Sequence, residues 1–230
     1  MATASRPRGP RRSRPPEWLA RYAAIGTTPT DSEELRVRKA VLTLSATLMT
    51  TLAFVWVATY ASLGLWLSAA IPLAYQIASV ASIVQFSRTR RYQLFRRSQL
   101  SMTLLLPFAL QWSLGGFERS SVVGLWAITA PLGALLFVGA RQAWPWFVAF
   151  GVLVVASGLI DPTLAAHAPD VPSGVVVTFF VLNVTAVATT AFLLLQYFVQ
   201  AREREQARRC RTGHRRGAHR QGRTDSHGLR

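Results

Sequence analysis

Long uncharged apolar runs, separated by short polar connections, make up most of the chain. Each run is close to the ~20 residues that an α-helix needs to cross the hydrocarbon core of a bilayer. The pattern predicts an all-α integral membrane protein, in which a six-helix transmembrane domain occupies residues 39–200. The six predicted helices span residues 40–61, 65–86, 99–116, 122–140, 143–160 and 175–199.

Positive charge lies almost entirely outside these runs. Of the 26 Lys and Arg residues, nine lie in residues 1–39 and ten follow Gln200. Because Lys and Arg in short connections mark the cytoplasmic side of a membrane, both termini and the connection 87–98 are expected in the cytoplasm. We therefore expect a multi-pass protein of the plasma membrane. The connection 87–98 carries five arginines: Arg88, Arg90, Arg91, Arg96 and Arg97.

The segment before the membrane, residues 1–38, is expected to be a basic cytoplasmic tail. Residues 1–16 are rich in Pro and Arg and are predicted to be disordered, because they contain too few apolar residues to form a core. Residues 17–24, "EWLARYAA", are predicted to form a short helix on the membrane surface, with Trp18 and Tyr22 in the interface.

The stretch "TPTDSEELRVRKA" predicts the start of the first long helix. Thr30 or Asp31 is expected to cap this helix, since both side chains can accept a hydrogen bond from a backbone N–H. Glu33 or Glu34 follows three residues later and is expected to complete a capping box.

Inside the predicted spans the polar side chains are amides and hydroxyls, and no Asp, Glu, Lys, Arg or His lies at depth. Ion-coupled transporters generally need ionisable groups there, so this class is disfavoured. Small residues four apart on the last span, such as Thr185 and Thr189, would permit a homodimer. The amides expected to bond between helices are Gln76, Gln85, Gln111, Asn183 and Gln196.

The sequence indicates no catalytic, cofactor-binding or metal-binding residues. His214, His219 and His227 are separated by arginines, whose charge opposes metal binding, and Cys210 is the single cysteine. Nucleic-acid binding is also disfavoured, because the basic residues flank membrane spans. The lipid bilayer and its anionic lipids are the partners that this placement favours.

The entry "DSEELRVRKA", the six short-looped spans and the exit "YFVQAREREQAR" resemble the membrane half of bacterial class III adenylate cyclases, most closely the six-helix actinobacterial type. The resemblance covers about residues 18–207. It implies a membrane bundle that anchors, and senses for, a cytoplasmic catalytic domain, with a charged helix after the last span as transmitter. In that family, paired catalytic domains use two aspartates and two Mg or Mn ions to convert ATP to cyclic AMP and pyrophosphate.

Residues 201–230 are interpreted as the start of the transmitter helix, to about Ala207, followed by a disordered Arg-rich tail. A catalytic domain needs about 100 residues or more, so the expected function is a cyclase anchor and sensor module, truncated or frameshifted before its catalytic half and not itself an enzyme. A genuine basic tail that binds anionic lipid is the other interpretation of the ending. The alternative function is a standalone six-helix membrane protein that binds or transports a small molecule.

The predicted topology can be tested with reporter fusions. The connection 161–174 has two acidic residues and no Lys or Arg, so it is expected outside the cell. Fusions at Arg91 and at the C-terminus should report the cytoplasm, and a fusion at Ala165 should report the outside. An external position for Arg91 would contradict the six-span arrangement.

Overall fold

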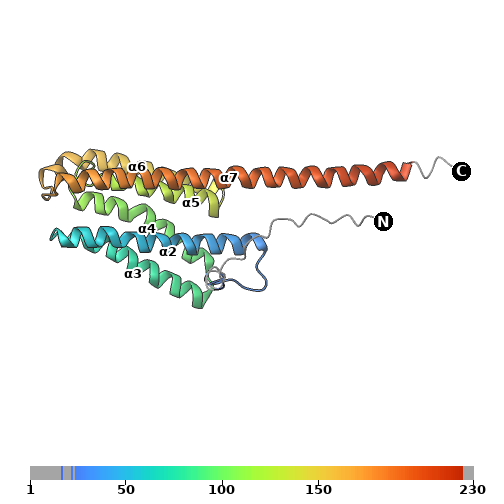
Figure 1. Cartoon of the computed structure of the whole chain (residues 1–230), viewed down its shortest axis with the longest axis horizontal. Coiled ribbons are helices and arrows are strands. Elements are labelled where there is room, and N and C mark those ends of the chain that lie inside the picture. Colours follow the sequence, from blue (N-terminus) through green and yellow to red (C-terminus); the bar gives the residue numbers. More distant parts are fainter. Residues whose placement is uncertain (1–16, 18–21, 23, 225–230) are drawn as a thin grey trace, which may run out of the picture. The chain divides into compact units, whose positions relative to one another are not determined.

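The computed structural model describes Glu17, Tyr22 and residues 24–224, and over these residues the chain is helical with no strand. The all-α prediction is therefore confirmed. The predictions for residues 1–16 and for Trp18 lie outside the described residues. In chain order the elements are α2 (Glu33–Ser62), α3 (Trp66–Thr89), α4 (Tyr92–Ser113), the 3-10 helix η1 (Val123–Ile128), α5 (Thr129–Phe137), α6 (Ala140–Ala166) and α7 (Ser173–Thr224) (Figure 1).

Four helices are long and apolar enough to cross a membrane: α2, α3, α6 and the Ser173–Gln196 part of α7. This composition is that of a multi-pass membrane protein, as the sequence predicts. The other two predicted spans are shorter apolar stretches. α4 begins among the arginines of the 87–98 connection, and the predicted span 122–140 is divided between η1 and α5. The six-span count therefore stays a prediction.

Pro131 explains why the predicted span 122–140 is not one α-helix. Proline has no N–H to donate to the carbonyl four residues earlier, so it suits the first turn of a helix, where that N–H has no partner. The chain runs as a 3-10 helix up to Ile128, and the α-helix begins only at Thr129. Val122, which precedes η1, has a left-handed backbone conformation with φ of 51°.

Two helices extend beyond their predicted ends. α6 continues through Pro162 to Ala166, so part of the predicted 161–174 connection is helical. α7 continues to Thr224, although the predicted end of this helix is near Ala207 with disorder after it. The residues after Gln200 include many Ala, Arg, Glu and Gln, which are good helix formers, and no proline follows Pro172.

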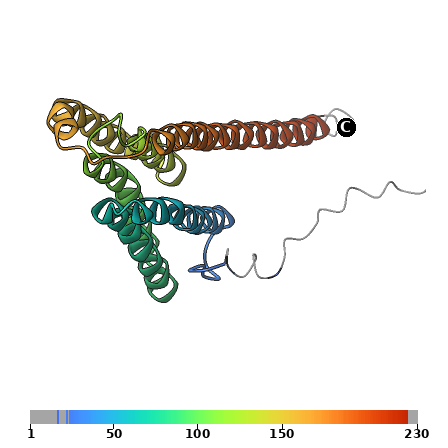
Figure 2. The ribbon, with the colours of Figure 1, turned by 60° about the vertical axis from the view of Figure 1, so that its left-hand side comes forward.

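The chain divides into two compact units, at Met102 and Thr103. In the first unit, α2 and α3 pack side by side (Figures 1 and 2), and hydroxyls and amides join them to the start of α4. Such bonds satisfy polar groups that lipid cannot. They are Gln76 Nε2 to the Thr50 carbonyl (2.9 Å), Thr50 Oγ1 to Ser79 Oγ (2.9 Å), Gln99 Nε2 to Ser79 Oγ (3.2 Å) and Ser82 Oγ to Ser98 Oγ (2.7 Å).

The second unit contains the end of α4 with η1, α5, α6 and α7. Its core is Leu104, Phe108, Ala127 and Ala130, against which α6 packs aromatic and aliphatic side chains. Asn183 of α7 is fully buried. Its Oδ1 accepts the Trp126 indole N–H at 3.0 Å, and its Nδ2 donates to the Ser121 carbonyl at 2.9 Å.

The carboxylate of Asp161 fixes the connection that follows α4. Asp161 Oδ1 accepts the backbone N–H of Phe117 at 2.9 Å. Gly116, with φ of +98°, precedes that amide, and a Cβ at this position would collide with the Asp161 carboxylate. A residue expected to lie in an outer connection therefore lies inside α6 and holds a turn.

Asn183→Ala should lower the free energy of unfolding by about 1–3 kcal/mol, because it removes the acceptor of the Trp126 indole and the donor to a buried carbonyl. Gln85→Ala is the matched control, since Gln85 is an exposed amide of the predicted set and should change stability little. Thermal unfolding in one detergent, followed by circular dichroism, measures both. Equal losses in the two variants would contradict the assigned role of Asn183.

Candidate functional site

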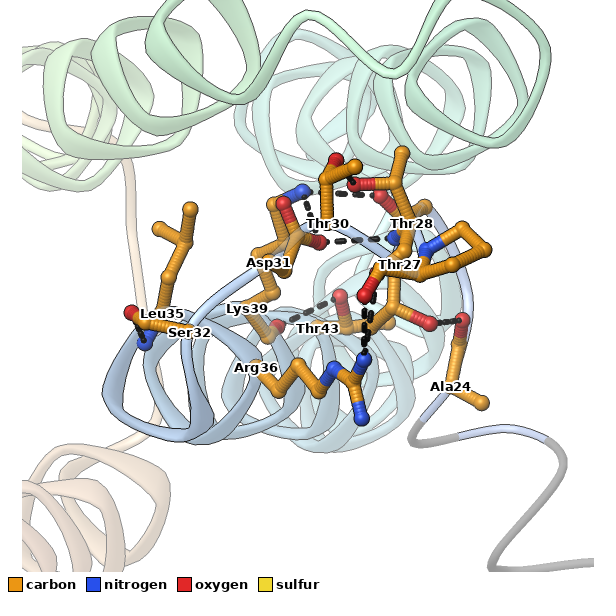
Figure 3. A network of polar contacts seen from close by, with 12 residues as sticks. Ala24, Thr27, Thr28, Thr30, Asp31, Ser32, Leu35, Arg36, Lys39 and Thr43 are labelled. Carbon is orange, nitrogen blue, oxygen red and sulfur yellow. Dashed lines mark hydrogen bonds and ion pairs between the residues drawn. The ribbon is translucent and has the colours of Figure 1, made fainter.

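A network of polar contacts joins residues 24–32, which we call the entry loop, to the first turns of α2 (Figure 3). At its centre lies an ion pair between Asp31 of the loop and Lys39 of α2, with Lys39 Nζ 2.7 Å from Asp31 Oδ2. The two side chains are only 9% and 4% exposed, respectively. A buried charge destabilises a fold unless it is paired and hydrogen-bonded, so the remaining partners of both groups matter.

Both charged groups have such partners. Lys39 Nζ also donates to the Gly26 carbonyl at 3.0 Å, and Asp31 Oδ2 also accepts the Thr28 backbone N–H at 2.7 Å. The first contact joins Lys39 to the loop at Gly26, and the second joins Asp31 to the loop at Thr28. The pair therefore fixes the path of the loop as well as neutralising two charges.

The start of α2 differs from its prediction in which residue caps it. Ser32 is the N-cap, and its hydroxyl accepts the Leu35 backbone N–H at 3.2 Å. The expectation of a cap at Thr30 or Asp31 is wrong, because the Asp31 carboxylate is occupied by Lys39 and Thr28. The predicted capping box is also wrong, since the residue three after Ser32 is a leucine.

Glu33 and Glu34 lie instead in the first turn of α2, where negative charge favours the positive end of the helix dipole. Glu34 pairs with Arg38 one turn later, at 2.7 Å between Oε1 and Nη2, in an exposed position. Arg36 Nη2 donates to the Pro29 carbonyl at 2.9 Å. The first turns of α2 thus contact the loop through Arg36 as well as Lys39.

The entry loop also lies against the end of α3. Gly26 has φ of +70°, and a Cβ there would collide with the Phe86 ring, so glycine is required for both the conformation and the close approach. Phe86 in turn stacks on Phe95 of α4, with ring centroids 4.5 Å apart and planes 5° apart. Tyr22, predicted to lie in the membrane interface, places its hydroxyl 2.5 Å from Thr47 Oγ1 of α2.

The hydrogen bond from Lys39, assisted by the Thr28 N–H, lowers the pKa of Asp31 from an ordinary 3.8 to about 2. Both contacts favour the charged carboxylate, which accepts but cannot donate. Asp31 is thus ionised at neutral pH and has no proton to transfer there. Its chemistry in this arrangement is that of an anchor for the entry loop.

The residues singled out from sequence fall into distinct groups. Gln76 and Asn183 bond between elements as predicted, while Gln85 and Gln196 are exposed. Gln111 is fully buried, and its amide N and O have no hydrogen-bond partner among the described residues.

No catalytic, cofactor or metal residues were expected, and within the described residues no three His, Cys, Asp or Glu side chains gather as a metal set would. Side chains at Cys210, His214 and His219 are not described, and His227 lies outside the described residues.

Sequence reasoning missed the Asp31–Lys39 pair. Lys39 is the single lysine beside 25 arginines, and it stands at the first turns of an apolar run with an aspartate eight residues before it. That signal was available. The Ser79–Gln99 contact had none, because nothing in the sequence says which faces of α3 and α4 meet.

Comparison of the chain with protein-family models, with curated proteins and with solved structures found no match in any of the three.

The depressed pKa of Asp31 predicts an acid-sensitive component of stability. A carboxyl whose pKa is lower in the folded state stabilises the fold at pH values above its ordinary pKa, and this contribution disappears as the pH falls from about 4 to about 2. Thermal unfolding from pH 2 to pH 7 should show the loss in the wild type. The difference in melting temperature between the wild type and Asp31→Asn, plotted against pH, should separate the contribution of Asp31 from those of the other carboxyls.

Lys39→Met should abolish the same component, because it removes the largest cause of the low pKa. Arg38→Met is the matched control, since it breaks an exposed pair that contributes little. If Lys39→Met and Arg38→Met gave the same pH profile, the anchoring role of the pair would be refuted.

Proposed function

We propose that this chain is the membrane anchor and sensor module of a signalling protein, arranged as in the membrane half of class III adenylate cyclases. In this function α7 is the output helix, which carries a change in the bundle to the cytoplasmic side. The continuity of α7 is the observation that supports the proposal most directly.

α7 is one helix of 52 residues, from Ser173 to Thr224, and both views of the ribbon show it without interruption (Figures 1 and 2). Its membrane-crossing part ends at Gln196. The remaining 28 residues, 197–224, extend the helix by about 42 Å at ~1.5 Å per residue. A helix that only closed a bundle would need no such extension, whereas an output helix does.

The entry loop supports the same function within the first unit. A sensor needs a fixed reference against which one helix can move. The Asp31–Lys39 pair holds the entry loop to α2, and the close approach of Gly26 to Phe86 places the same loop against the end of α3 within the first unit.

The chemistry implied by the resemblance would belong to a catalytic domain joined to α7. The Mg or Mn ions and ATP would be bound there, and no residue of this sequence matches the metal-binding aspartates of that family. Since those domains act in pairs, the proposal includes a homodimer. Thr185 and Thr189 are exposed on α7 and are small enough for close helix contact.

One observation supports the alternative, a standalone small-molecule binder. The Gln111 amide is fully buried and has no hydrogen-bond partner among the described residues, and it lies where a Cβ of Gly124 would be. Buried amides without partners are rare in folded proteins, and some serve a ligand. This function would be favoured if Gln111→Leu abolished the binding of a small molecule and if removal of the α7 extension left that binding unchanged.

Chimeras test the output role of α7. Residues 1–207 are joined to the catalytic domain of a class III adenylate cyclase through zero to four inserted alanines, and cyclic AMP formation is measured in membranes. Each alanine rotates the following domain by about 100°. We expect activity that is lowest at two insertions, about 200° of rotation, and that recovers at three and four, where the rotation is within about 60° and 40° of a full turn.

The same chimeras with Gly-Ser insertions are the control, because a flexible linker does not transmit rotation. They should show no periodic dependence. Activity that is equal for all alanine insertions, with the chimeras still in the membrane, would contradict an output function for α7.

A further inference from the structure

The end of α3 and the start of α4 carry concentrated positive charge, with five arginines in residues 88–97 and no Asp or Glu. Arg96 lies over the Tyr92 ring, 5.5 Å from its centroid. The other four are exposed, and the two ion pairs found among the described residues do not involve them. We call these four residues the arginine turn: Arg88, Arg90, Arg91 and Arg97.

The backbone of the arginine turn places an arginine where glycine fits best. Arg90 ends α3 in the left-handed conformation, with φ of 55° and ψ of 17°, and its N–H donates to the Phe86 carbonyl at 2.8 Å. Glycine is the usual residue in such a cap, because a Cβ makes the conformation unfavourable. The need to end α3 therefore does not explain an arginine at position 90. What Arg90 provides and glycine would not is a positive charge.

The turn is held in a fixed conformation. The Tyr92 N–H donates to the Arg90 carbonyl at 3.0 Å, immediately before α4 begins. Below the turn, the stacked rings of Phe86 and Phe95 are 1% and 2% exposed and join the ends of the two helices. The four guanidinium groups are thus carried on a preorganised support and not on a flexible segment.

The length of α3 places the turn at the level of lipid headgroups. α3 has 24 residues, from Trp66 to Thr89, and is about 36 Å long. The hydrocarbon core of a bilayer is ~30 Å thick. Trp66, at the opposite end, is 72% exposed, as expected for an aromatic residue in one interface. With Trp66 in one interface, the arginine turn lies among the headgroups of the other leaflet.

We propose that the arginine turn is a binding site for the headgroups of anionic phospholipids. Guanidinium groups bind phosphate oxygens in pairs of parallel hydrogen bonds, and these four lie where such phosphates are concentrated. Each arginine near an anionic surface strengthens binding by about fivefold. The inference goes beyond the proposed signalling function and does not depend on it, because it requires no output through α7 and no catalytic partner.

A local probe tests the site in the full chain. A fluorophore is attached through Gln93→Cys, an exposed position beside the turn, in a chain that also carries Cys210→Ser. The protein is reconstituted in phosphatidylcholine nanodiscs with increasing phosphatidylglycerol that bears a spin-label quencher near its headgroup. Spin-labelled phosphatidylcholine is the reference lipid. We expect phosphatidylglycerol to reach half-maximal quenching at a mole fraction several-fold lower than the reference.

Arg90→Gly separates binding from folding. Glycine suits the backbone at this position, so the melting temperature should stay equal or rise, while the preference for phosphatidylglycerol should weaken by about fivefold. Arg91→Gln should weaken it similarly. Arg119→Gln, which removes an exposed arginine of the second unit, should leave it unchanged.

Equal quenching by the two lipids around the unaltered turn would overturn the proposal, and so would a preference that survives Arg90→Gly combined with Arg91→Gln. The comparison of lipids on the unaltered turn decides the question even if a variant fails to fold. Relief of quenching by inorganic phosphate, beyond that caused by chloride of equal ionic strength, would also overturn it, because the site would then bind a soluble anion.

Discussion

Inside a bilayer no water is present to hydrogen-bond with the backbone, so each N–H and carbonyl must find its partner within the protein. This constraint accounts for the helices and also for how their hydroxyls behave. Thr43 and Thr50 donate to the carbonyls four residues earlier, and Thr50 also reaches Ser79 of the next helix. These hydroxyls form hydrogen bonds with groups of the protein itself. The buried Gln111 amide is an exception, because its N and O have no hydrogen-bond partner among the described residues.

The constraint ends at the membrane surface, and there the structure uses charge. The Asp31–Lys39 pair, the Glu34–Arg38 pair and the arginine turn all belong to one end of the first unit. Of these, Asp31 and Lys39 have the most burial and the most contacts with the loop. The pair therefore serves structure, whereas the exposed arginines remain available to a partner.

Hydrophobic periodicity and length were enough to predict an all-α membrane protein, and most helix positions follow from them. The division of the 122–140 span was readable in principle from Pro131, but a uniformly apolar run hid it. The extension of α6 through Pro162 could not be predicted in the same way. Proline at this position, near the end of the helix, removes one backbone hydrogen bond and does not end the helix.

For the site, the sequence showed which charges exist but not which of them meet. Asp31 was interpreted as a helix cap from its position, and only the folded loop shows that its carboxylate binds Lys39 and the Thr28 N–H while Ser32 caps the helix. Residue type could not separate Ser32 from Asp31 as the cap, since serine and aspartate are equally good there. Contacts eight residues apart across a turn depend on the path of the loop, which Gly26 determines by its close approach to Phe86.

The sequence of α7 contains neither glycine nor proline between Gly174 and Gly213. A helix without such residues has few sites for a sharp kink, and in the proposed output function it would act as a lever. The glycine-free arm beyond Gln196, residues 197–212, is about 24 Å long, so a tilt of about 10° inside the bilayer would displace its far end by about 4 Å. In the proposed output function, a small change of packing around Asn183 would thus reach the far end of this arm as a movement of several ångströms.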